Sequence, residues 1–161
     1  MKIKSYTPEY RNQIISLILY IQNFEQKVNL SLEEQPDMTD IPKYYQMNGG
    51  DFWIAIDDSG DVIGTLGLMK KEKHYGILKK FFVKPEFRGG KIGTANNLYY
   101  HLITKAKELG IDTIVLDTPL ACNRAHSFYR KHNFVEIPKE QLPIKYDYPD
   151  RDSLLFIKKI E

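Results

Sequence analysis

The stretch that decides the fold is "VKPEFRGGKIGTANNLYYHLI", residues 83–103 of the 161-residue chain. It follows an apolar run, places three glycines and two basic residues between positions 88 and 93, and continues with helical periodicity. A strand, a basic glycine-rich loop and a helix in this order can bind a phosphate, because the first N–H groups of a helix lack partners within it. The alternative is a plain connector whose glycines only turn the chain.

Spacing excludes two nucleotide-binding motifs. With Gly90 and Lys91 as its central pair, a Walker loop needs glycine at position 85 and serine or threonine at position 92, which hold proline and isoleucine. No three glycines have the G-x-G-x-x-G spacing of a dinucleotide fingerprint. The loop therefore predicts a different phosphate site, or the plain connector.

Composition limits the classes of function. The chain is 42% apolar and 27% charged, which is ordinary for a globular protein, and its length predicts one domain over residues 1–161. A net charge of +2 without a Lys/Arg run gives no support for nucleic-acid binding. One cysteine and four scattered histidines predict neither a disulfide nor a metal site. The first residues lack a signal-peptide core, and no apolar run approaches the ~20 residues of a membrane span, so we expect a cytoplasmic protein.

Hydrophobic periodicity and turn residues predict a mixed α/β fold in the order β-α-α-β-β-β-α-β-α-β-β. Gly60 marks a hairpin turn, Pro85 ends a strand, and Asn133 can end a helix in the left-handed conformation. The predicted strands are residues 2–6, 51–57, 61–70, 75–85, 111–117, 134–137 and 152–160, and the predicted helices are residues 9–26, 39–49, 92–109 and 123–132. The predicted apolar face of the first helix is Ile14, Ile18, Ile21 and Phe24 or Glu25. That of the helix after the loop is Ile92, Ala95, Leu98 or Tyr99, Leu102, Ala106 and Leu109.

Residues 81–118, "FFVKPEFRGGKIGTANNLYYHLITKAKELGIDTIVLDT", and residues 123–134, "NRAHSFYRKHNF", resemble the acetyl-CoA-binding core of the GCN5-related N-acetyltransferases (GNAT). That family has the loop Arg/Gln-x-x-Gly-x-Gly/Ala and a later helix with Asn-x-x-Ala-x-x-x-Tyr. The resemblance covers residues 75–135. It implies a mostly antiparallel mixed sheet of six to seven strands flanked by about four helices, and acetyl-CoA-dependent acetylation of a primary amine on a small molecule, amino acid or peptide.

The resemblance also implies roles for individual residues. Tyr129 matches the tyrosine that protonates the departing CoA thiolate, and Asp117 matches a position where some members carry a catalytic glutamate, which makes it the candidate base. Lys91 replaces the first glycine of the loop motif, and Cys122 replaces the usual asparagine. The implied cofactor-binding residues are Phe82, Val83, Arg88, Gly89, Gly90, Lys91, Ile92, Gly93, Thr94, Cys122 and Asn123.

Each of these residues has an ordinary structural interpretation as well. Tyr129 and His126 are candidates for core packing, although His126 is also an alternative base. Asp117 can cap the turn that follows it, and Cys122 is a candidate buried apolar side chain. Lys79 and Lys80 are consecutive in a predicted strand, so we expect them on opposite faces of the sheet.

Acceptor specificity is expected outside the shared core, in residues 24–38 and 139–150. Acidic residues of the first segment could attract a cationic amine, and Tyr146 or Tyr148 could form a pocket wall. These acidic residues are Glu25, Glu33, Glu34 and Asp37. We expect no nucleic acid or membrane partner, and a monomer or homodimer. Two alternatives stay open: a non-catalytic acyl-CoA-binding regulator, and an unrelated α/β domain whose loop binds nothing.

Overall fold

One sheet of seven strands runs through the computed structural model, which describes residues 1–161. The strand order is β1-β2-β3-β4-β5-β7-β6, and every pair is antiparallel except β4 with β5. The predicted mixed, mostly antiparallel sheet of six to seven strands is thus confirmed. The strands are β1 (Lys2–Ser5), β2 (Asp51–Ile56), β3 (Val62–Lys71), β4 (Tyr75–Val83), β5 (Thr113–Thr118), β6 (Val135–Ile137) and β7 (Leu154–Lys159).

Three α-helices and several short helical turns cover the sheet. The helices are α1 (Arg11–Tyr20), α2 (Thr94–Glu108) and α3 (Asn123–Lys131). A 3-10 turn at Pro8–Tyr10 precedes α1, and a π-helical turn at Ile21–Glu25 extends it. The helix predicted over residues 39–49 is only the helical turn Pro42–Gln46.

Two boundary predictions were wrong for local reasons. We predicted that the helix after the glycine-rich loop starts at Ile92, but Gly93 has a φ of 79° and is the N-cap, so α2 begins at Thr94. Ile92 is 44% exposed rather than part of the apolar face. The periodicity placed either Phe24 or Glu25 on the buried face of the first helix, yet both are exposed. Phe24 is 73% exposed and stacks on Tyr20, because the π-helical turn changes the rotation of the helix there.

The two faces of the sheet carry separate cores. On one face α2 and α3 pack against the central strands, with Leu98, Leu102 and Tyr129 in a cluster of 17 buried residues. On the other face α1 and the segment around Tyr45 form a cluster of 12, which includes Ile14 at the position that the helical periodicity predicted. None of the helices has the length and apolarity needed to cross a bilayer.

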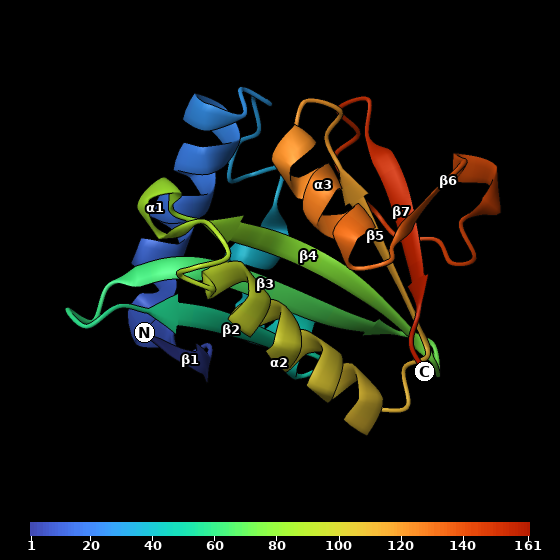
Figure 1. Cartoon of the computed structure of the whole chain (residues 1–161), viewed down its shortest axis with the longest axis horizontal. Coiled ribbons are helices and arrows are strands. Elements are labelled where there is room, and N and C mark those ends of the chain that lie inside the picture. Colours follow the sequence, from blue (N-terminus) through green and yellow to red (C-terminus); the bar gives the residue numbers. More distant parts are fainter.

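The sheet opens between its two parallel strands. β4 and β5 pair only from Tyr75–Ile77 to Thr113–Val115 and separate beyond that point. Figure 1 shows the two strands meeting near the C-terminus and diverging toward the edge where α1 and α3 lie. The edge of β4 from Leu78 to Val83 therefore has no strand partner on the β5 side, and its polar backbone groups are available to a ligand.

Candidate active site

Two cavities adjoin at this opening. A cleft of about 430 Å³ lies between β4, the glycine-rich loop and α3. A smaller cavity of about 90 Å³ lies between the ends of β4 and β5. Phe81, Phe82, Cys122, Ala125 and Tyr129 line both. A molecule bound along the cleft would thus place its end beside the side chains of the small cavity.

The glycine-rich loop presents unpaired backbone donors at the start of α2. The N–H groups of residues 89–92 and 94–96 make no hydrogen bond within the protein. Gly89 and Gly93 have φ values of 107° and 79°, which explains glycine at both positions. Lys91, the departure from the family motif, does not have a positive φ, so its Cβ causes no backbone strain. This arrangement suits a bound phosphate group.

The Arg88 side chain is directed toward the protein. Its Nε donates to the carbonyl oxygen of Val83 at 2.9 Å, and its Nη2 forms an ion pair with Glu25. Arg88 thereby fastens the loop to the end of β4 and to the turn after α1. In this conformation the backbone N–H groups, rather than the guanidinium, are the free donors of the loop.

The structure brings most of the predicted site residues together. Asp117 and Tyr129 both line the small cavity. Lys91, Ile92, Gly93 and Thr94 do not line the cleft, and Thr94 is fully buried with no hydrogen-bond partner for its Oγ1. The predicted cofactor-binding residues that do line the cleft are Phe82, Val83, Arg88, Gly89, Gly90, Cys122 and Asn123.

Tyr129 combines a buried ring with a free hydroxyl group. Its ring packs between Phe134 and Phe156, at centroid distances of 5.7 and 5.8 Å, and only 5% of the residue is exposed. Its hydroxyl makes no hydrogen bond within the protein, although the residue lines both cavities. Burial raises the pKa of Tyr129, and the nearby Asp117 adds to the shift, so the phenol stays protonated and can donate a proton.

Asp117 lines the same small cavity as Tyr129. Its Oδ1 accepts a hydrogen bond of 3.0 Å from the Tyr146 hydroxyl. Burial raises the pKa of Asp117, and the Lys79 ammonium and the Tyr146 hydrogen bond oppose the shift. A carboxylate with a raised pKa is a stronger base. The alternative role for Asp117, capping the turn at Thr118 and Pro119, has no side-chain hydrogen bond in its support.

The surroundings of Cys122 and His126, the two other candidates for a chemical role, indicate that both are structural. Burial raises the pKa of the Cys122 thiol to about 11, so the thiol is protonated and unreactive at neutral pH. His126 is 4% exposed, its Nε2 lies 3.0 Å from the Pro119 carbonyl oxygen, and it lines neither cavity. Cys122 therefore contributes a small apolar wall, and His126 packs at the base of α3.

A β-bulge places both lysines of β4 on the same side of the sheet. The β3–β4 register shifts between Thr65 and Gly67, and Lys80 has a φ of 56°. The bulge leaves the Lys80 carbonyl outside the regular ladder, where the Thr65 hydroxyl donates to it at 2.7 Å. Lys79 and Lys80 both line the small cavity and the groove beyond it. The prediction that they face opposite ways was wrong, because it assumed a regular strand.

Lys80 belongs to a buried polar cluster that sequence reasoning missed. Its ammonium lies 3.5 Å from Asp37, and the Tyr45 hydroxyl donates to the same carboxylate at 2.6 Å. Only 7% of the Lys80 side chain is exposed, and burial lowers its pKa. Asp37 and Lys80 are 43 residues apart in the sequence, and only the tertiary fold brings them together. No spacing in the sequence signals their contact.

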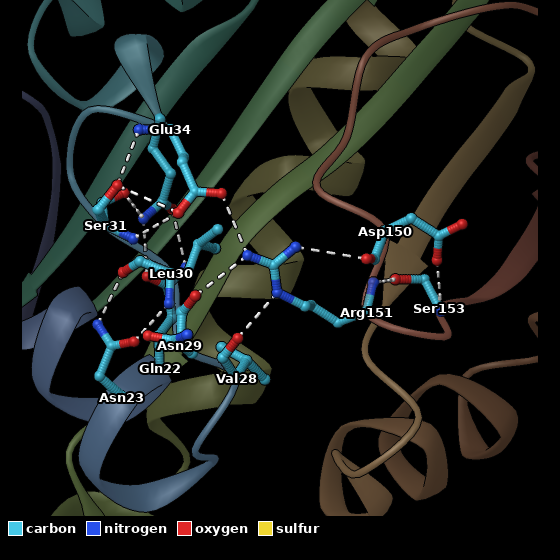
Figure 2. A network of polar contacts seen from close by, with 11 residues as sticks. Gln22, Asn23, Val28, Asn29, Leu30, Ser31, Glu34, Asp150, Arg151 and Ser153 are labelled. Carbon is cyan, nitrogen blue, oxygen red and sulfur yellow. Dashed lines mark hydrogen bonds and ion pairs between the residues drawn. The ribbon is translucent and has the colours of Figure 1, made fainter.

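Arg151 joins two segments that border the small cavity, the loop after α1 and the loop before β7. Figure 2 shows its guanidinium between residues 28–34 and residues 150–153. It donates to the carbonyl oxygens of Val28 and Asn29 at 2.9 and 3.1 Å and to Glu34 at 3.1 Å. The long loop before β7 is thus tied to the loop after α1. The two segments in which acceptor specificity was predicted therefore lie close together.

Three of the four acidic residues expected to attract a cationic amine are already paired. Glu25 pairs with Arg88, Glu34 with Arg151 and Asp37 with Lys80. Glu33 is exposed and unpaired. The expected acidic attraction is therefore largely neutralised within the protein.

Comparison with known proteins identifies the fold. The chain resembles an acetyltransferase from Streptococcus agalactiae (35% identity, TM-score 0.94, covering 99% of this chain and 98% of that one). It also resembles a GNAT-family acetyltransferase from Staphylococcus aureus (31% identity, TM-score 0.95, covering 99% of each chain). An uncharacterised N-acetyltransferase of Dictyostelium discoideum is 40% identical over 81 residues, 50% of this chain and 34% of that protein. The chain spans between 34% and 54% of the length of three such relatives.

The model of the acetyltransferase (GNAT) family matches residues 18–134, which include the glycine-rich loop, the opening between β4 and β5, and α3. This match covers most of the chain and confirms the resemblance seen in the loop and in the Tyr129 helix. The chain belongs to the GNAT family of acetyltransferases.

Proposed function

We propose that this protein transfers an acetyl group from acetyl-CoA to a primary amine by direct attack, with both substrates bound at once. The observation that carries the proposal is the position of Tyr129 and Asp117. Tyr129 lines both the cleft and the small cavity, and Asp117 lines the small cavity. A proton donor and a proton acceptor therefore share the cavity in which the cleft ends.

The cleft fits coenzyme A chemically. The free N–H groups at the start of α2 would bind the pyrophosphate, and the unpaired edge of β4 would pair with the amide groups of the pantetheine arm. Phe82, Val83, Gly89 and Gly90 line this path. When bound, acetyl-CoA supplies the activated acyl group as a thioester.

The residues of the small cavity would move two protons. In the proposed reaction the amine nitrogen attacks the thioester carbonyl carbon, a C–N bond forms and the C–S bond breaks. Asp117 accepts a proton from the amine, and Tyr129 donates its proton to the departing sulfur. Such positioned acid–base groups each contribute about 10² to 10⁴-fold in rate. A backbone N–H of β4 would stabilise the charge on the carbonyl oxygen, an effect of about 2.7 to 4 kcal/mol.

A panel of amines tests the proposal. Purified protein, acetyl-CoA and one amine at a time are monitored for release of free CoA thiol, with amino acids, polyamines, aminoglycosides and peptides as acceptors. Acetyl-CoA-dependent thiol release above the rate without amine supports the proposal. Binding of CoA, seen as a rise in Tm, with no turnover on any amine would favour a non-catalytic acyl-CoA-binding regulator.

A further inference from the structure

The groove on the acceptor side of the small cavity is rich in cations. It has a volume of about 1240 Å³ and lies over the sheet face opposite α2 and α3, bordered by residues 139–151. Seven lysine or arginine side chains line it, against four aspartate or glutamate side chains. Lys79, Lys80, Pro149 and Arg151 line both the groove and the small cavity, so the two spaces adjoin.

The pairing of these charges leaves an excess of free lysines. Arg151 is neutralised by Glu34, Lys80 by Asp37, and Lys139 lies 3.9 Å from Asp150. The lysines of the groove that have no carboxylate partner are Lys70, Lys71, Lys79 and Lys145. Only Glu140 and Asp147 line the groove as unpaired acids. A surface of this charge raises the local concentration of anions and repels polycations.

Lys79 is the free lysine nearest to the proposed chemistry. Of the four unpaired lysines it alone lines the small cavity as well as the groove. Its Nζ lies 3.4 Å from the Asp147 carbonyl oxygen and 5.6 Å from the centre of the Tyr146 ring. These contacts fix the position of the ammonium but do not neutralise its charge.

Tyr146 contacts both Lys79 and Asp117. Its ring lies under the Lys79 ammonium, while its hydroxyl donates to the Asp117 carboxylate. Lys79 and Asp117 make no ion pair with each other. The small cavity is thus lined by a cation and a carboxylate, and Tyr146, which lines the adjoining groove, contacts both. This pair of charges is complementary to a molecule that carries both an amine and a carboxylate.

We propose that the acceptor is an amine that also bears a carboxylate, as a free amino acid does, and that Lys79 binds this carboxylate while the amine faces Asp117. The inference rests on the proposed acetyl transfer and adds the class of acceptor to it. The bond that forms and the protons that move are those of the transfer itself. Lys79 acts by binding, through a charge-assisted hydrogen bond to the carboxylate.

The test compares acceptors that differ only in charge. Wild-type protein is assayed for thiol release with the common L-amino acids, the matching amino-acid amides, spermidine and 2-aminoethyl phosphate. We expect kcat/KM for the best amino acid to exceed that for its amide by about tenfold or more, since a hydrogen bond between charged groups has that effect. Preference for the amide or spermidine overturns the inference while leaving acetyl transfer intact. Preference for 2-aminoethyl phosphate overturns the choice of carboxylate.

Variants of Lys79 separate charge from structure. Lys79→Met should raise KM for the amino acid about tenfold or more, with a much smaller effect on the amide, and Lys79→Arg should retain most of the preference. Lys107→Met removes the same charge from an exposed position on α2 and is the matched control. It should leave KM unchanged for both the amino acid and the amide. An equal loss for acid and amide in Lys79→Met would assign Lys79 a structural role and refute the inference. Absence of turnover on every acceptor, with CoA still bound, would refute the proposed function itself.

Discussion

Replacing Tyr129 by phenylalanine removes one hydroxyl group and leaves the buried ring in place. The ring packs against Phe134 and Phe156 at centroid distances of 5.7 and 5.8 Å, and phenylalanine retains these contacts. The hydroxyl makes no hydrogen bond within the protein, so no partner is left unsatisfied by its loss. We therefore expect the free energy of unfolding of Tyr129→Phe to stay within about 1 kcal/mol of the wild-type value.

The effect on catalysis should be far larger. Loss of a general acid lowers kcat by about 10² to 10⁴-fold, which corresponds to about 2.7 to 5.4 kcal/mol of activation free energy at 1.36 kcal/mol per decade. The assay is thiol release at saturating acetyl-CoA and acceptor, with urea unfolding and calorimetric binding of CoA measured on the same preparation. We expect unchanged CoA affinity beside the loss of kcat.

Two further variants make the result interpretable. Tyr100→Phe makes the same change on the outer face of α2, where Tyr100 is 68% exposed, and should leave kcat unchanged. Tyr129→Ala also removes the ring and should cost about 3 to 5 kcal/mol of stability, as large core truncations do. A kcat of Tyr129→Phe within threefold of the wild type, with normal CoA binding, would refute the role of Tyr129 as general acid.

Three other changes have defined outcomes. Asp117→Asn should lower kcat by about 10² to 10⁴-fold, because it removes the proposed base. It should also raise Tm at pH 7: the pKa of Asp117 is raised in the native state, so native stability falls as pH rises from the ordinary carboxyl range through the native pKa, and asparagine does not ionise. A lower Tm at pH 7 would contradict this account. Gly93→Ala forces a Cβ into a φ of 79° and should cost about 1 to 2 kcal/mol in urea unfolding, whereas Lys91→Ala should change stability by less than about 0.5 kcal/mol. Asp37→Ala leaves both the Lys80 ammonium and the Tyr45 hydroxyl buried without their partner and should cost about 3 to 5 kcal/mol. Asp37→Ala combined with Lys80→Met should restore the part of this loss that comes from the unpaired charge; equal losses in the single and double variants would argue against the ion pair.

The local sequence was sufficient to predict the helices and strands that form the core. Apolar residues at helical spacing correctly predicted the buried faces of α1 and α2, for example Ile14 and Leu102. Asn133 has a φ of 68° beyond the end of α3, as predicted from its tolerance of the left-handed conformation. These features depend on residues close in sequence, so periodicity and turn chemistry are enough to find them.

The irregularities of the backbone could not be read in this way. The bulge at Lys80 and the π-helical turn after α1 depend on how β4 meets β3 and how residues 21–25 pack, and they redirected Lys80 and Phe24. Hydrophobic periodicity can indicate only a regular repeat of two residues for a strand or 3.6 residues for a helix. Each irregularity therefore produced one wrong prediction about which way a side chain points.

By itself the sequence determined the strand–loop–helix unit at residues 83–103, the glycine-rich loop in it, and the resemblance of Tyr129 and Asp117 to family positions. These properties reside in short segments whose residues act on their own neighbours. The tertiary structure alone decided which charged side chains are paired and which line the small cavity. It paired Glu25, Glu34 and Asp37 with distant cations and left Lys79 free beside Asp117. Charges meet through contacts across 43 or more residues of chain, and such contacts exist only once the sheet has formed.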